Sequence, residues 1–398
     1  MIYLFFPFLG LFALKNFFHS VVNVVNIKCM DNCFQSLHRK EKDLLLSIIK
    51  AKSISRTTLQ KESDLKVANF YNTVDSLLSH GLIEKTEDTQ HQSKGRPSEF
   101  LSLNPDAYNT LYILLSRSKC HLAVSNLVGD LYEEEEYPVS FSITVDDFIS
   151  SVKEYYLKKK DNYKIAFITF VTGINRKKRR DHRLDASFYT RNVEEELSKT
   201  LDLPIFFDSI ARAAALGIYN EKYSSEHLSL VFCNLSTGIG VGMVHDLIPE
   251  EFWYNNRISI EHWTVDPNGR ECVCGEKGCL LSYLGSRNIV DNINQAKNEK
   301  KISDIKEAIE ASNNGDEDAM NIMKEAAVAF SRAIKQLYGV LHFDVAAIGG
   351  STCENNEYFR SQVEENLKDM PFILDYEQNY IGKTSKGICY RLLLELLT

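Results

Sequence analysis

How the rest of this chain is interpreted depends on one stretch, His262-Trp-Thr-Val-Asp-Pro-Asn-Gly-Arg-Glu-Cys272-Val-Cys274-Gly275-Glu-Lys-Gly278-Cys279. It places one imidazole and three thiols within eighteen residues, and its glycines allow the backbone to turn the thiols inward. Zinc takes four nitrogen or sulfur ligands in a tetrahedron, and a set of three cysteines and one histidine leaves no open position for catalysis. The stretch therefore predicts a structural zinc bound by His262, Cys272, Cys274 and Cys279.

Two other interpretations of the stretch are a disulfide pair and buried thiols without a shared role. Three thiols so close together cannot all pair with one another, and nothing else in the sequence indicates an oxidising compartment. The six cysteines outside the stretch are typical of reduced thiols in a cytoplasmic protein: Cys29, Cys33, Cys120, Cys233, Cys353 and Cys389.

The pattern His-x9-Cys-x-Cys-Gly-x-x-Gly-Cys-Leu in this stretch resembles the zinc signature of the ROK family, which contains bacterial sugar kinases and sugar-responsive repressors. The resemblance extends from about residue 40 to the C-terminus. It implies a two-lobed α/β domain over residues 110–398, with the actin-like, ribonuclease H-like architecture of sugar kinases. Residues outside the zinc signature must decide between a kinase and a repressor.

The composition is that of a soluble globular protein with two or three domains. A chain of 398 residues can bury a large core, and its 44% hydrophobic and 25% charged residues are ordinary values. The net charge of −8 excludes a general binder of polyanions, so any contact with nucleic acid must be local.

Residues 1–33 form an apolar N-terminal extension. The first fourteen, MIYLFFPFLGLFAL, are too few to span about 30 Å of hydrocarbon as a helix. No basic segment precedes them and no small-residue cleavage site follows, as a signal peptide requires. We expect translation to start at Met30 and membrane contact to be absent; a membrane-anchored regulator is the alternative.

Residues 34–105 are predicted to fold as an α+β winged helix-turn-helix domain. One helix carries Leu44, Leu45, Ile48 and Ile49 on a single face, and Ser55 begins a second, short helix. A third helix, over about 66–78, carries an apolar stripe of Phe70, Val74, Leu77 and Leu78 and stops at Gly81. Two short strands, 82–85 and 100–103, then flank a polar hairpin.

The third helix is expected to enter the major groove of DNA, where side chains distinguish all four base pairs. Eleven Lys/Arg against nine Asp/Glu make this domain mildly basic. Its Ser55-Arg56-x-x-Leu59 and Gly95-Arg96-Pro97 motifs resemble the arm of ROK repressors, which implies that Arg96 is the wing arginine; such an arginine suits a narrow minor groove. The alternative is a three-helix module that contacts only protein. The candidate DNA-binding residues are Arg56, Lys66, Asn69, Tyr71, Asn72, Thr73, Lys94, Gly95 and Arg96.

Alternating strands and helices follow from Leu111. We expect strands over 111–115, 121–125, 129–135, 164–171 and 345–348, helices over 148–159, 288–298 and 319–337, and a sheet buried on both faces. Where a ROK kinase carries a glycine-rich phosphate loop, this chain has Ser116-Arg117-Ser118-Lys119-Cys120, without a glycine. The basic run 176–180 is a solvated loop or an auxiliary DNA-phosphate contact.

The segment Asp208-Ser209-Ile210-Ala211-Arg212 argues against catalysis. By resemblance, the kinases carry Asn-Asp where Ser209-Ile210 stands, and that Asp takes the proton of the sugar hydroxyl. Isoleucine has no lone pair and can neither orient nor deprotonate a hydroxyl group. Asp208 is a conceivable substitute, but strand geometry places it about 6–7 Å from residue 210. Hence we predict that the domain has no catalytic residue. Leu235–Gly242, with three alternating glycines, is expected to form a tight β-turn.

The sugar ligands of the family are also incomplete. Family members carry Glu-x-x-His where this chain has Ser259-Ile260-Glu261-His262, and Leu-Glu after the last cysteine where it has Leu280-Leu281. Losing two carboxylates should weaken sugar binding strongly, because charge-assisted hydrogen bonds to hydroxyls are lost. The candidate residues of an altered effector pocket are Ser209, Ser259, Glu261 and His262.

Together these features predict a DNA-binding transcriptional repressor of carbohydrate-metabolism genes. We expect it to bind a double-stranded DNA operator as a homodimer, because two-fold symmetry matches two half-sites, and to respond to a sugar or sugar-phosphate effector. One alternative is an ATP-dependent sugar kinase with an appended DNA-binding arm. Another is a regulator that binds DNA constitutively, without an effector.

Overall fold

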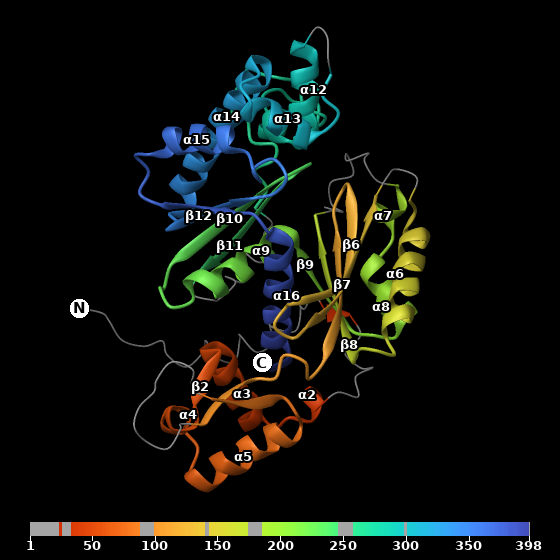
Figure 1. Cartoon of the computed structure of the whole chain (residues 1–398), viewed down its shortest axis with the longest axis vertical. Helices are drawn as coiled ribbons and strands as arrows, with labels where there is room; N and C mark the ends of the chain where they lie inside the picture. Colours follow the sequence, from red (N-terminus) through yellow and green to blue (C-terminus); the bar gives the residue numbers. More distant parts are fainter. Residues whose placement is uncertain are drawn as a thin grey trace, which may run out of the picture.

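The computed structural model describes residues 24–25, 33–87, 99–139, 143–173, 185–245, 258–297 and 301–397. Figure 1 shows a small N-terminal arm, residues 33–103, below two lobes that are each built on a β-sheet. The two-lobed α/β architecture agrees with the fold class predicted for residues 110–398.

The arm combines helices with a three-stranded antiparallel sheet of order β2-β4-β3. The predicted stripe of α3, from Leu44 to Ile49, is buried, and the hydroxyl of Ser55 caps α4 by accepting from the Thr58 amide. Strand β2 was not predicted, because only its pairing with β4 identifies it. The elements are α2 (Cys33–Ser36), α3 (Arg39–Ala51), β2 (Ser53–Ser55), α4 (Arg56–Glu62), α5 (Val67–Ser79), β3 (Ile83–Glu87) and β4 (Glu99–Leu103).

The first lobe contains a six-stranded sheet of order β1-β9-β8-β5-β6-β7. Strands β5, β6 and β7 form an antiparallel meander, whereas β8 and β9 run parallel to β5. Helices α6 and α8 cover one face. The elements are β5 (Asn109–Leu115), β6 (Lys119–Asn126), β7 (Leu131–Pro138), α6 (Val145–Lys159), β8 (Ile165–Thr172), α7 (Ser187–Thr190), α8 (Val193–Leu201) and β9 (Ile205–Ser209).

The expectation of a sheet buried on both faces is wrong for β7. Strands β5 and β6 are buried almost throughout, but β7 is an edge strand whose glutamates 133, 134 and 136 face solvent. Charged side chains on an edge strand discourage pairing with a further strand. The acidic run is therefore accounted for by its place at the sheet edge.

The second lobe contains a four-stranded sheet of order β11-β10-β12-β13, with helices α11 to α15 on its outer side. The helices and the strand predicted here are present, with slightly different ends. The elements are β10 (Ser229–Leu235), β11 (Ile239–His245), α11 (Leu280–Leu284), α12 (Ser286–Ala296), α13 (Ile305–Asn313), α14 (Glu317–Leu341), β12 (Val345–Gly349), α15 (Glu357–Leu367) and β13 (Ile373–Glu377).

Two helices join the lobes: α9 (Ile210–Ile218), continued by the π-helical turn η3 (Tyr219–Tyr223), and the C-terminal α16 (Tyr380–Leu397). They approach very closely, because a Cβ at Gly217 or at Gly387 would overlap the backbone of the other helix. In Figure 1, α16 runs from between the lobes down to the arm. There the Lys42 ammonium group donates to the Leu396 carbonyl at 3.0 Å, and one apolar core continues from the arm into α16.

Part of the N-terminal extension joins the first lobe. Strand β1 (Val24–Val25) pairs antiparallel with Ile205 and Phe206 of β9, at a position that precedes the predicted start at Met30. Residues 1–23 and 26–32 lie outside the described part of the chain. No described helix is long and apolar enough to cross a membrane.

Candidate functional site

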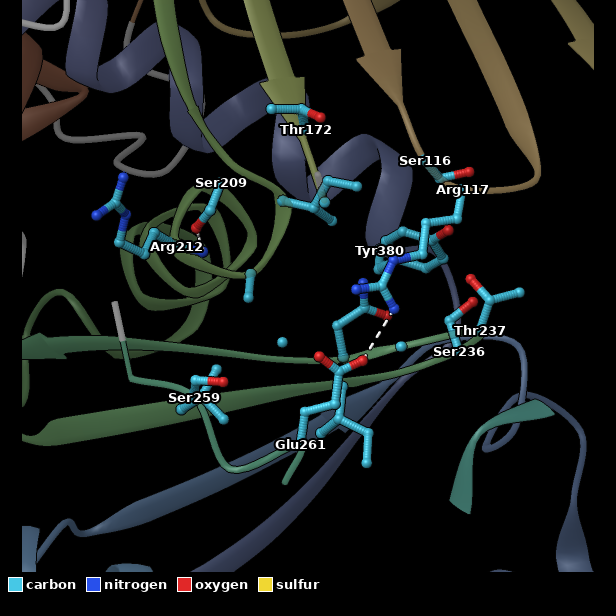
Figure 2. Close-up of a pocket in the computed structure, with 18 of the residues that line it drawn as sticks. Ser116, Arg117, Thr172, Ser209, Arg212, Ser236, Thr237, Ser259, Glu261 and Tyr380 are labelled. Carbon is cyan, nitrogen blue, oxygen red and sulfur yellow. Dashed lines mark hydrogen bonds and ion pairs between the residues drawn. The ribbon is translucent and has the colours of Figure 1, made fainter. Parts of the chain in front are cut away.

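A cleft between the two lobes brings together segments that are far apart in the sequence (Figure 2). The β5–β6 turn and the end of β8 supply its wall on the first lobe, and the β10–β11 turn and residues 258–261 supply its wall on the second. The N-terminus of α9 and the first residue of α16 complete it. The position matches that of a substrate or effector site between two lobes.

Arg117 and Glu261 form an ion pair across this cleft. The Arg117 Nη1 atom donates to Glu261 Oε1 at 2.9 Å, and the two side chains are only 11% and 7% exposed (Figure 2). The guanidinium group lies against the β10–β11 turn so closely that a Cβ at Gly238 would overlap it. The β5–β6 turn, which has no glycine where a ROK kinase carries its phosphate loop, thus places a buried cation in the cleft.

Ile210 lines the cleft and is the first residue of α9, at the end of β9. It is buried, and its side chain lies beside Gly173. The strand ends at Ser209, so the assumption that residues 208 and 210 share one face of a strand is wrong. Glu261 is the only carboxylate among the described residues that line the cleft.

Asp208 is not among the residues that line the cleft and belongs to a cluster of charged side chains. Its carboxylate pairs with Arg212 one helical turn later, and its Oδ2 atom accepts from Arg391 of α16 at 2.9 Å. Its Oδ1 atom also accepts from the Ser209 amide at 2.6 Å, and the side chain is almost fully buried. Two arginines and a backbone amide hold this carboxylate, which therefore does not take the place of a base at residue 210.

Hydroxyl groups make up much of the remaining lining. They come from both lobes and from α16, and Figure 2 labels them around the ion pair: Ser116, Thr172, Ser209, Ser236, Thr237, Ser259 and Tyr380. The Ser209 hydroxyl caps α9 by accepting from the Arg212 amide at 3.2 Å. Such a wall suits a ligand that carries several hydroxyl groups of its own.

The glycine-rich segment after β10 forms the predicted turn, closed by the Ser236 amide donating to the Gly238 carbonyl at 3.0 Å. Gly242 lies in β11, where a Cβ would overlap the backbone of Ala211 and Arg212. The glycine therefore lets β11 pack directly against α9. Its role is close packing between the second lobe and the connecting helix.

The four residues of the predicted zinc site are brought together. The side-chain ligand atoms of His262, Cys272, Cys274 and Cys279 lie within 4.8 Å of one another. Gly275 and Gly278 adopt positive φ angles of 93° and 70°, and a Cβ at Gly278 would overlap the Asp266 carbonyl, so the turn requires glycine there. Leu281, where the family carries Glu, packs on this cluster instead of lining the cleft.

The donor geometry fits a tetrahedral metal. Cys272 Sγ is 3.5 Å from His262 Nδ1, and Cys274 Sγ is 3.6 Å from Cys279 Sγ. Two thiolates on one zinc at about 2.3 Å each are separated by about 3.8 Å. Burial raises the pKa of the Cys279 thiol to about 12. A metal ion that binds here must therefore displace the proton of this thiol. The three cysteines of this cluster are free thiols, which excludes a disulfide among them.

Three of the four candidate effector residues line the cleft: Ser209, Ser259 and Glu261. His262 does not, because its ring belongs to the cysteine cluster. Sequence reasoning missed Arg117, Arg212 and Tyr380 as cleft residues. The lack of glycine in the β5–β6 turn was the sequence signal that could have indicated Arg117 as a cleft residue. Nothing in the sequence indicated that Glu261 is its partner.

The outer surface of the arm differs from the prediction at one position. Lys66, Asn69, Tyr71 and Asn72 are exposed, whereas Thr73 is buried and its hydroxyl donates to the Asn69 carbonyl at 2.8 Å. A β-branched hydroxyl can bond back to the preceding turn of its helix and so turn inward. Thr73 as a DNA-contacting residue is therefore a wrong prediction.

Arg56 of the arm is held by protein groups. Its guanidinium pairs with Glu99 at 2.7 Å and Asp75 at 3.3 Å, and stacks on the Tyr71 ring at 4.6 Å. These contacts join α4, α5 and β4 and orient Tyr71 at the surface. The remaining DNA-contact candidates, Lys94, Gly95 and Arg96, lie outside the described residues, as does the basic run 176–180.

Comparison with known proteins identifies relatives of two kinds. Residues 113–381 match the ROK family. A xylose repressor of Caldicellulosiruptor bescii is 24% identical over 360 residues, which cover 84% of this chain and 88% of the repressor. An N-acetylmannosamine kinase of Haemophilus influenzae is 32% identical over 181 residues, which cover 46% of this chain and only 59% of the kinase.

Solved structures agree on the fold. The crystal structure of a ROK family transcriptional regulator, a homologue of the Escherichia coli Mlc protein, superposes with a TM-score of 0.71 at 20% identity. The alignment covers 90% of this chain and 98% of that regulator, so it includes residues before the part that matches the family.

Proposed function

From the premise that this chain belongs to the ROK family, we propose that it is a DNA-binding transcriptional repressor of carbohydrate-metabolism genes. The observation that carries the proposal is the N-terminal arm, in which α3, α4, α5 and a β3–β4 hairpin have the order of a winged helix-turn-helix. The similarity to a xylose repressor over 84% of the chain supports it.

In this proposal α5 reads the operator in the major groove. Lys66, Asn69, Tyr71 and Asn72 are exposed at its N-terminal end and first turns, where a recognition helix contacts base edges. Arg56 acts indirectly, because it orients Tyr71 while paired with acidic residues. Arg96, which lies between β3 and β4 in the sequence, is proposed to insert into the minor groove. Two arms of a homodimer then bind the two half-sites of the operator.

The cleft binds an effector and performs no phosphoryl transfer. Ile210 stands where family kinases carry the base, and Asp208 is held by Arg212 and Arg391. Glu261, the one carboxylate among the described residues that line the cleft, is paired with Arg117. A base must accept the hydroxyl proton from within hydrogen-bond reach; Ile210 has no lone pair, Asp208 is not in the cleft lining, and Glu261 is engaged by Arg117 in the cleft without ligand.

The second candidate function is an ATP-dependent sugar kinase with an appended arm, which the 32% identity to an N-acetylmannosamine kinase favours. A coupled assay with ATP and a panel of hexoses and N-acetylhexosamines separates the two functions. Turnover at rates of about 1–100 s⁻¹, which are typical of kinases, would establish the kinase instead.

A structural zinc, held by His262, Cys272, Cys274 and Cys279, fixes the loop that ends at α11. Its chemistry is to neutralise the thiolates and to close a turn that has little apolar core of its own. Glu261 precedes the metal ligand His262, and its Oε2 atom lies 3.9 Å from His262 Nε2. The zinc loop thereby positions one wall of the effector cleft.

Helix α16 is the physical connection between cleft and arm. Tyr380 at its first turn lines the cleft, Arg391 in its middle pairs with Asp208, and the Leu396 carbonyl near its end accepts from Lys42 of α3. A ligand that moves the lobes must therefore move a helix that supports the arm. Such a displacement changes the spacing of the two recognition helices, which weakens operator binding.

The experiment that tests the function is recovery of genomic DNA crosslinked to the full chain. We expect short, roughly palindromic sites next to genes for carbohydrate transport or catabolism. An Arg96→Ala variant should recover those sites poorly, whereas Lys368→Ala on the far lobe, a surface residue that pairs with Glu365, should recover them normally. Uniform recovery of all genomic sequences by the wild-type chain would contradict a sequence-specific repressor.

A further inference from the structure

The Arg117–Glu261 ion pair occupies the effector cleft in the way that a ligand would. It spans the cleft between residues 144 positions apart in the chain, and both side chains are largely shielded from water. Separating two buried charges without compensation is unfavourable. Any molecule that enters between them must therefore offer a charge of its own.

The two members of the pair differ in the other groups beside them. Both charged groups lie against Gly238 of the β10–β11 turn, which blocks the movement of either group in that direction. The Glu261 carboxylate has a second partner within reach, because its Oε2 atom lies 3.9 Å from the Nε2 atom of His262. A small rotation would bring this carboxylate within hydrogen-bond distance of Nε2, the ring nitrogen of His262 that does not face the cysteines; with a metal at Nδ1, such a carboxylate–histidine contact would be a common arrangement.

The charges around the pair favour a negative ligand. Arg212 also lines the cleft, but its charge is compensated by Asp208, which lies outside the lining. Glu261 is the only carboxylate among the described lining residues, so its departure would leave the cleft positively charged. The surrounding seven hydroxyl side chains, described above, suit a polyhydroxylated body.

We propose that Glu261 stands in for the acidic group of the effector, and that a polyhydroxylated anion, a sugar phosphate or a sugar acid, binds by displacing Glu261 from Arg117. The guanidinium group binds phosphate or carboxylate through two parallel hydrogen bonds, and the sugar hydroxyls contact the hydroxyl-rich wall. A neutral sugar lacks the charge needed for this exchange. The exchange also breaks this ion pair between the two walls of the cleft. This inference rests on the proposed function, in which the cleft is the effector site.

The test is calorimetric titration of the full, zinc-loaded chain with matched ligands. The panel pairs each of several hexoses with its 6-phosphate, its uronic acid and its 2-amino derivative, and adds inorganic phosphate alone. We expect one or more sugar anions to bind at least about tenfold more tightly than their neutral parent, as the charge-assisted hydrogen bonds of Arg117 predict. The phosphate and uronate arms then distinguish the two kinds of anion.

Two variants give the inference its sharpest form. Glu261→Gln removes the internal competitor, so the apparent affinity for the anion should rise by about tenfold. Arg117→Met should lower anion affinity by at least about tenfold and leave the affinity for neutral sugars nearly unchanged. The matched control is Lys119→Met, which removes a cation two residues away that pairs with Glu136 outside the cleft. It should leave the preference for anions intact.

Each outcome decides the inference. Tightest binding by a neutral or amino sugar, absence of binding by every anion, or anion binding that survives Arg117→Met would overturn it. Zinc content and melting temperature are measured for each variant; if Glu261→Gln loses zinc, Arg117→Lys replaces it, with an expected intermediate loss because it keeps the charge without the paired donors.

Operator binding is measured on the same samples, so the two failures remain distinct. A chain that binds its operator but prefers a neutral sugar retains the proposed function and refutes the anionic effector. A chain that binds no operator fails the proposed function, whatever its ligand preference.

Discussion

The cysteine cluster adjoins the second-lobe wall of the proposed effector cleft, yet only the cluster keeps the pattern of its family. All four side chains of the cluster converge within 4.8 Å, from residues within one loop. The cleft, in contrast, has Ile210 where the family resemblance places the kinase base, an ion pair across its middle, and a carboxylate two residues away from the family position.

The difference indicates which parts of the domain are still required for its function. A structural metal site is needed for the loop to fold in a kinase or in a repressor. A catalytic base is needed only for chemistry, so a regulator can lose it and use the same space for binding. The dipeptide Glu261-His262 joins both regions, because one residue faces the cleft and the next belongs to the cluster.

The largest effect is expected when the cluster is broken. Cys274→Ser should lose zinc and destabilise the second lobe by several kcal/mol, because structural zinc sites in small peptides contribute about 10–16 kcal/mol. Zinc content and thermal unfolding measure it. Cys353→Ser, a buried thiol of the same lobe outside the cluster, is the control and should keep its zinc. If chelation leaves the melting curve of the wild-type chain unchanged, the cluster is not a structural metal site.

A smaller but still large effect is expected beside the cleft, at Asp208. Asp208→Asn leaves Arg212 and Arg391 without their buried counter-charge, and breaking such an arrangement costs about 3–5 kcal/mol. Urea unfolding measures the loss. Asp43→Asn, which removes an exposed partner of Arg39, should cost about 0–1 kcal/mol. Equal losses in the two variants would mean that the Asp208 cluster has no structural role.

Within the cleft, a double-mutant cycle measures the ion pair itself. Arg117→Met and Glu261→Gln should each destabilise the chain, and the double variant should be more stable than the sum of the two losses predicts. Residues in direct contact typically show coupling of about 0.5–3 kcal/mol. Additive losses would show that the cleft is held together by other contacts.

The smallest effect is expected in the arm, where residues 33–87 and 99–103 contain no metal-ligand cluster and the Arg56–Glu99 ion pair is partly exposed. Hydrogen bonds from Lys85 and Arg56 lower the pKa of Glu99, so the folded state favours its charged form. The resulting stabilisation is present above the unfolded pKa of 4.5 and is lost as the pH falls through the lower folded pKa.

For this partly exposed group we expect at most about 1 kcal/mol, measured by urea unfolding of the full chain across that pH range. Glu99→Gln should remove this part of the pH dependence. A variant whose stability still follows the wild-type pH profile would assign the effect to other carboxylates.

The contrast between cluster and cleft also explains what the sequence could predict. The helix of the arm with Leu44 and Ile48, the cap at Ser55 and the convergence of His262 with three cysteines depend on residues that are close in the sequence, and the structure contains all three features. Arg117 and Glu261 are 144 residues apart, and Asp208 and Arg391 are 183 apart. No periodicity or local motif connects such pairs, so only the assembled fold identifies them.

Errors also arose where the burial of a residue or strand differs from what its residue type suggests. Thr73 has a polar side chain, but a bond to the Asn69 carbonyl lets it turn inward. Strand β7 was expected to be buried like its neighbours, but it lies at the edge of the sheet. Neither property follows from residue type alone.

The most direct test of the central claim is a titration of the full chain against a duplex recovered from the genome, followed by fluorescence anisotropy at several salt concentrations. The account predicts saturable, sequence-specific binding that weakens linearly in a log–log plot against salt and is reduced in an Asn72→Ala variant. A chain that binds this duplex no better than unrelated DNA, and that instead phosphorylates a hexose at ordinary kinase rates, would contradict it.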